Sequence, residues 1–116
     1  MSHGLFQKFL KTMTSDTTLS SEIDLQRSFS KNYLEVPTMT SGTDIFIQAA
    51  CESQGDYRRV NHEVPNTSSV QSHTFVIGSA TTQKMVPIPS GFRYLKVELS
   101  TAMTATAVIF KVICSD

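Results

Sequence analysis

The strongest constraint on the fold is a hydrophobic pattern with a period of two, which recurs in short segments along the chain. It is clearest in DIFIQAAC (44–51), FRYLKVELS (92–100) and AVIFKVIC (107–114). A period of two places alternate side chains on one face of a β-strand. About eight such segments, separated by turn signals, are typical of a two-sheet β-sandwich rather than of βαβ units. We therefore predict an all-β sandwich of jelly-roll or Greek-key topology over residues 19–116.

The same alternation predicts which side chains form the core of this sandwich. These are Ile45, Ile47, Leu95, Val97, Val108, Phe110 and Val112. The last segment is apolar on both faces, because Ile109 and Ile113 point away from the core residues of the same strand. We therefore expect the C-terminal strand to lie in the centre of a sheet.

The N-terminal residues have a different spacing. The apolar positions are Leu5, Phe6, Phe9, Leu10 and Met13. This spacing predicts a short amphipathic helix over residues 3–13, within an N-terminal arm of residues 1–18 that lies outside the sandwich. A helix of this length is marginal in water, so it needs a surface to lie on. That surface is either an open end of its own domain or a groove on a neighbouring subunit.

Charge and composition weigh against several classes of protein. Ten basic and ten acidic residues cancel, and no segment has the basic surplus of a nucleic-acid binder. No apolar run is long enough for a membrane helix, and the N-terminus lacks a secretory pattern, so we expect synthesis in the cytoplasm. There the two cysteines, Cys51 and Cys114, should be reduced and buried as small apolar groups.

Motifs that carry chemistry are missing from the sequence. No nucleophile elbow, phosphate-binding glycine loop or metal-ligand spacing accompanies the three histidines or the two cysteines. We therefore predict no catalytic residue, no metal site and no cofactor. The adjacent Arg58 and Arg59 would point to opposite faces of a strand. Ion pairs within the fold are the expected role of the arginines, and Arg59 is expected to pair with a carboxylate. Arg58 stays a candidate for contact with an acidic partner.

Several segments together resemble small virion proteins of tailed bacteriophages. They are LSSEIDLQRSFSKNYLEVPTMTSGTDIFIQA (19–49), DYRRV (56–60) and VPIPSGFRYLKVELSTAMTATAVIFKVIC (86–114). The resemblance implies a non-enzymatic capsid cement or decoration protein, which binds the major capsid protein and is located in the virion. It also implies a homo-oligomer, either a dimer or a trimer, with no nucleic-acid or membrane partner.

The predicted partner-binding residues combine the arm with one arginine. They are Leu5, Phe6, Phe9, Leu10, Met13 and Arg58. Two other locations in the virion remain open. One is a receptor- or carbohydrate-binding module of a tail fibre or baseplate, for which Tyr33, Phe46, Phe92 and Tyr94 are candidate sugar platforms. The other is a structural protein of the neck or head–tail junction.

Overall fold

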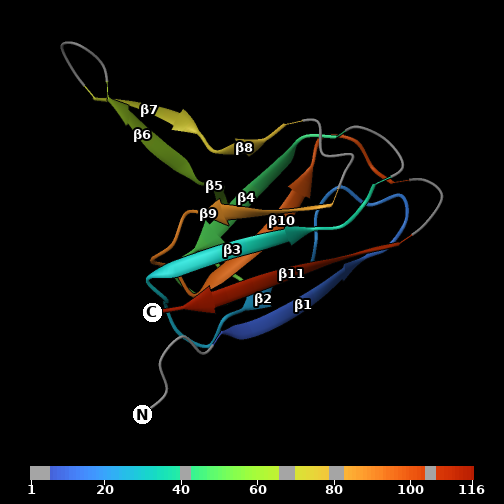
Figure 1. The fold of residues 1–116 in the computed structure, drawn as a ribbon, viewed down its shortest axis with the longest axis horizontal. Helices are drawn as coiled ribbons and strands as arrows, with labels where there is room; N and C mark the ends of the chain where they lie inside the picture. Colours follow the sequence, from blue (N-terminus) through green and yellow to red (C-terminus); the bar gives the residue numbers. More distant parts are fainter. Residues whose placement is uncertain (1–5, 40–42, 66–69, 79–82, 104–106) are drawn as a thin grey trace.

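The structure is a computed structural model, and it describes residues 6–39, 43–65, 70–78, 83–103 and 107–116. Every regular element within these ranges is a β-strand. Two sheets, of four and five strands, pack against each other, and a two-stranded hairpin extends from them (Figure 1). The predicted two-sheet β-sandwich is confirmed. In the described part of the chain there is no helix that could cross a membrane.

The four-stranded sheet has the order β1–β11–β3–β9, and each strand is antiparallel to its neighbours. Its strands are β1 (Gln7–Met13), β11 (Val108–Ser115), β3 (Lys31–Val36) and β9 (Lys84–Ile88). β11 lies between β1 and β3, so the prediction of a central C-terminal strand is confirmed. Its core face is apolar: Phe110, Val112 and Cys114 point into the core and have no exposed surface.

The five-stranded sheet has the order β2–β10–β4–β5, with β8 also paired to β4. Its strands are β2 (Ile23–Asp24), β10 (Tyr94–Leu99), β4 (Ile45–Ala50), β5 (Arg58–Arg59) and β8 (Val76–Ile77). β10 and β4 pair over their whole length, from Tyr94 opposite Ala50 to Leu99 opposite Ile45.

β5 and β8 share one strand position. β5 pairs with Gln48 and Ala49 of β4, and β8 pairs with Ile45 and Phe46 on the same side of that strand. If β5 and β8 are counted as one strand, the two sheets contain eight strand positions. Renumbered from 1 to 8 along the chain, these positions have the order 1-8-3-6 in the four-stranded sheet and 2-7-4-5 in the other. This is the strand order of a jelly roll, which consists of two Greek keys. The predicted topology is therefore confirmed.

A hairpin interrupts that shared strand position. It consists of β6 (Asn61–Pro65) and β7 (Val70–Thr74), which are antiparallel. At its base, the Phe75 N–H donates a hydrogen bond of 2.9 Å to the Val60 carbonyl. This bond joins the two ends of the hairpin, where the chain leaves the five-stranded sheet and returns to it. Figure 1 shows the hairpin extending away from the sandwich at the upper left.

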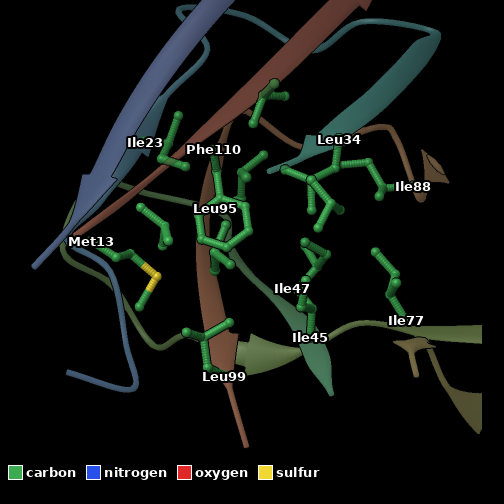
Figure 2. Packing of buried hydrophobic residues seen from close by; sticks show 14 of the residues in the cluster. Met13, Ile23, Leu34, Ile45, Ile47, Ile77, Ile88, Leu95, Leu99 and Phe110 are labelled. Atoms are coloured by element: carbon green, nitrogen blue, oxygen red, sulfur yellow. The ribbon is translucent and has the colours of Figure 1, made fainter. Parts of the chain in front are cut away.

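The core lies between the two sheets, as Figure 2 shows. All seven side chains predicted for its centre are buried, with exposed fractions between 0% and 6%. Phe110 enters from β11 and Leu95 from β10, so the two sheets contribute to one cluster. Residues outside the strands complete it: Leu25, Phe29, Met39 and Met103.

The predicted N-terminal helix is wrong, because Gln7–Met13 forms β1. β1 pairs with β11 over seven consecutive positions, so it is an edge strand of the sandwich rather than a separate arm. A spacing of four residues, as between Phe9 and Met13, fits one helical turn and also two strand repeats. The edge of β11 offers β1 a full set of main-chain hydrogen bonds, whereas an isolated short helix is marginal in water.

Candidate interaction surface

The outer surface of the four-stranded sheet is unusually apolar. We define this apolar face as the side chains of the sheet and its flanks that point away from the core: Phe6, Lys8, Leu10, Tyr33, Glu35, Pro37, Gln83, Met85, Pro87, Ile109, Lys111 and Ile113. Within the described ranges, six large hydrophobic side chains are exposed, and four of them are on this face. Their exposed fractions run from 48% for Ile109 to 59% for Leu10.

Two rows of side chains cross the apolar face from β1 to β9. The first row is Lys8, Ile113, Tyr33 and Pro87, and the second is Leu10, Lys111, Glu35 and Met85. Side chains that lie directly opposite on antiparallel strands are close enough to interact. Each row therefore forms one continuous strip of surface. In the first row one residue of the four, Lys8, is charged, and in the second the apolar Leu10 and Met85 flank the charged Lys111 and Glu35.

The face has two shallow depressions. One is lined by Phe6, Lys8, Tyr33, Met85 and Ile113. The other is lined by Leu10, Glu35, Pro37, Gln83, Ile109 and Lys111. In the second, Lys111 Nζ lies 3.9 Å from Glu35 Oε2, and Gln83 Nε2 donates a hydrogen bond of 3.4 Å to Glu35 Oε1. The charges at the centre of the face thus form one ion pair.

The outer surface of the five-stranded sheet has the opposite character. Arg59 donates from Nε and Nη2 to the two carboxylate oxygens of Glu98, at 2.9 and 2.7 Å, and Gln48 adds a third bond of 2.9 Å. The Arg59 guanidinium also lies 3.9 Å from the centre of the Phe46 ring. The Arg59 hydrogen bond is the main cause that holds the pKa of Glu98 below its usual value. The prediction of a carboxylate partner for Arg59 is confirmed.

A second acidic group anchors the chain between β4 and β5 to the residues before β2. Glu22 accepts hydrogen bonds from Ser53 Oγ at 2.7 Å, the Gln54 N–H at 2.7 Å and the Tyr57 hydroxyl at 2.6 Å. These bonds, that of the Gln54 main chain first, hold the pKa of Glu22 below its usual range. Burial and the bond to Glu22 raise the pKa of Tyr57. Within the described ranges, no cluster of three His, Cys, Asp or Glu side chains could hold a metal ion.

The carboxylates of this polar surface make stability depend on pH. The pKa of Glu98 is lower in the folded state than its ordinary value of 4.5, so its pairing stabilises the fold above pH 4.5. That contribution is lost as the pH falls through the lowered folded-state pKa. We expect urea midpoints to fall between pH 5 and pH 3, and Glu98→Gln to make that fall smaller. An equal fall in both proteins would contradict the role of this carboxylate.

The residues predicted for partner binding do not form one surface. Phe6 and Leu10 lie on the apolar face. Met13 is buried in the core. The Phe9 ring packs edge-on against the Phe29 ring, with 6.4 Å between the ring centres, so neither residue is available to a partner. Leu5 lies outside the described residues. The helical interpretation put all of them on one stripe, whereas a strand sends alternate residues to opposite faces.

Arg58 lies apart from the apolar face. It is exposed on β5, and it borders a depression with Asp56 and Phe92 at one end of the five-stranded sheet. Any contact that it makes with an acidic partner is therefore independent of Phe6 and Leu10.

Sequence reasoning missed most of the apolar face. Tyr33 and Met85 join it only because β3 and β9 pair in one register, which no local pattern reveals. One signal was available in the sequence: Ile109 and Ile113 lie on the opposite side of β11 from Phe110 and Val112, whose side chains fill the core. Nothing in the described part of the fold covers Ile109, which is 48% exposed.

The two cysteines differ in environment. Both are free thiols, Cys114 is buried as expected, and Cys51 is exposed, which corrects the expectation that both are buried. Burial raises the pKa of the Cys114 thiol to about 11, so it stays protonated at pH 8. We expect iodoacetamide at pH 8 to modify one thiol of the native protein and two after unfolding in urea, as measured by mass. Rapid double modification of the folded protein would contradict this environment.

Comparison of the chain with models of protein families, with curated proteins and with solved structures finds no match.

Proposed function

We propose that the protein is a non-enzymatic structural component of a tailed-bacteriophage virion. Its role is that of a capsid cement or decoration protein, which is made in the host cytoplasm and then binds and stabilises the shell of major capsid protein. Three features support the proposal: the sequence resemblance in residues 19–49, 56–60 and 86–114, the jelly-roll topology, and the apolar face. Jelly rolls occur in viral capsid proteins and also in lectins, so the topology alone does not decide the function.

The observation that carries the proposal is the difference between the two outer surfaces of the sandwich. On the polar surface the carboxylates of Glu98 and Asp24 are paired, with Arg59 and Arg93. The apolar face leaves Phe6, Leu10 and Met85 more than half exposed. Burial of one such side chain gains about 1.5–3 kcal/mol. Apolar patches of this kind on a domain with a complete core mark surfaces that contact other proteins.

The carbohydrate-binding alternative is less well supported, because its candidate platforms are occupied. A sugar ring needs an open aromatic face. The Phe46 ring is covered by the Arg59 guanidinium at 3.9 Å, and the Tyr94 ring has the Arg93 guanidinium at 4.9 Å. Phe92 is partly buried against the core. Tyr33 is the one remaining candidate ring, and it lies in the apolar face.

The copy number of the protein in purified virions tests the proposal. A shell repeats its contacts many times, so we expect on the order of hundreds of copies per particle, from quantitative mass spectrometry against the major capsid protein. About a dozen copies or fewer would assign the protein to the tail or neck instead. Absence from purified particles would contradict a virion role altogether.

A further inference from the structure

We propose that a second copy of this chain covers the apolar face, in a dimer with two-fold symmetry. This inference rests on the proposed function, in that it names the neighbour that contacts the assembly surface. The two-fold axis lies between the two faces, parallel to the strands, and runs between β11 and β3. Two twisted sheets pack face to face with their strands within about 30° of each other, which this arrangement satisfies.

The symmetry decides which residues meet. Rotation about an axis parallel to the strands keeps every residue at the same height along the sheet. It places β11 of one copy over β3 of the other, and β1 over β9. A side chain on β11 therefore faces the β3 residue of the same row in the second copy, and a side chain on β1 faces the β9 residue of its row. The same contact with the two copies exchanged forms at the same time, as an isologous interface requires.

The side chains that meet in this way match in chemistry. In the centre Ile113 faces Tyr33 of the second copy, and Ile109 faces Pro37. Pro37 lies opposite Ile109 when the pairing of Lys111 with Glu35 is continued by two residues along β11 and β3. Further out Leu10 faces Met85 of the second copy. Lys8 and Thr12 lie on β1, the edge strand of the sheet, where polar groups keep contact with water.

The central charges provide the sharpest match. Lys111 and Glu35 are neighbours across β11 and β3, with 3.9 Å between Nζ and Oε2, and they lie on either side of the axis. In the dimer Lys111 faces Glu35 of the second copy, and Glu35 faces Lys111. Four charges of alternating sign then surround the axis, so each ammonium has two carboxylate neighbours. An unrelated acidic or basic partner surface would leave one of the two charges opposite a like charge.

The size of the face sets the strength of the dimer. Four strands spaced about 4.8 Å apart and about seven residues long form a face of roughly 20 by 25 Å. An interface built from two such faces is at the small end of the specific range, near about 1,000 Å² in total. We therefore expect a reversible dimer of the 12.8 kDa chain, with dissociation visible in a concentration series.

Charge reversal of the two central residues tests the arrangement by sedimentation. Lys111→Glu makes both charged positions acidic, and Glu35→Lys makes both basic, so each variant alone should be monomeric at concentrations where the wild type is dimeric. In an equimolar mixture every acidic position faces a basic one, and a heterodimer should form. An interface in which position 111 faces position 35 of the other copy predicts both the loss in each single variant and the rescue in the mixture. An interface that paired like positions would already oppose like charges in the wild type, so it predicts the rescue without the loss.

The matched control is Lys96→Glu, the same change on β10 of the polar surface, which should leave the dimer unchanged. Thermal melts of all variants show that the monomers are folded. A wild type that is monomeric up to millimolar concentration overturns the inference, as does a dimer that survives Lys111→Glu or a mixture that stays monomeric. The dimer is measured on the purified chain and the copy number on virions that carry the wild-type protein, so failure of the dimer and failure of the proposed function are distinguishable.

Discussion

Deletion of residues 1–15 is expected to unfold the domain. The deletion removes β1, so β11 loses all seven of its paired positions on that side. It also removes Met13, which is 2% exposed, and Phe9, which packs against the core. Loss of one buried methionine side chain costs about 2–5 kcal/mol, out of a total stability of about 5–15 kcal/mol for a typical domain. In a thermal melt followed by circular dichroism we expect no cooperative transition, or a Tm at least about 10 °C lower.

Two point variants separate core packing from the apolar face within the same strand. Met13→Ala should lower the free energy of unfolding by about 2–5 kcal/mol, because it leaves a cavity. In protein diluted to the monomer, Leu10→Ala should change it by less than about 0.5 kcal/mol, because Leu10 is 59% exposed in the single chain. A truncated protein that melts like the full chain would restore the interpretation of the N-terminus as a detachable docking arm.

Phe110→Ala should cost about 3–5 kcal/mol, the range for truncation of a fully buried phenylalanine. Phe110 has no exposed surface, and it enters the core from the central strand of the four-stranded sheet. The adjacent Ile109→Ala is the control, because it removes a side chain that points the other way. Urea titration measures both variants. A loss below 1 kcal/mol for Phe110→Ala would mean that the two faces of β11 are assigned in reverse.

Most of the fold could be predicted because the core strands alternate cleanly. Ile45 and Ile47, or Leu95 and Val97, are separated by residues that point outward, so their period of two has no helical alternative. The N-terminal segment lacked that clarity, since Phe9 and Met13 fit both periods. What decides between the periods is the free edge of β11, at the opposite end of the chain, and no local pattern contains that information.

The apolar face was harder to predict than the core, because it depends on pairing between strands that are distant in sequence. Lys111 and Glu35 become neighbours only through the register of β11 and β3. The pairing of β6 with β7 in the hairpin likewise depends on a register that no local pattern gives.

The central claim is that the apolar face is an assembly surface of a virion protein, and one comparison tests it most directly. Ile109 on the apolar face and Val76 on β8 of the other sheet are matched, with exposed fractions of 48% and 46%. Virions assembled with Ile109→Asp should carry less than about one tenth of the normal number of copies, because avidity amplifies the loss of each contact. Virions assembled with Val76→Asp should carry the normal number, and both purified variants, diluted to monomers, should melt at nearly the temperature of the monomeric wild type. A normal copy number for Ile109→Asp, measured by mass spectrometry of purified particles, would contradict the account.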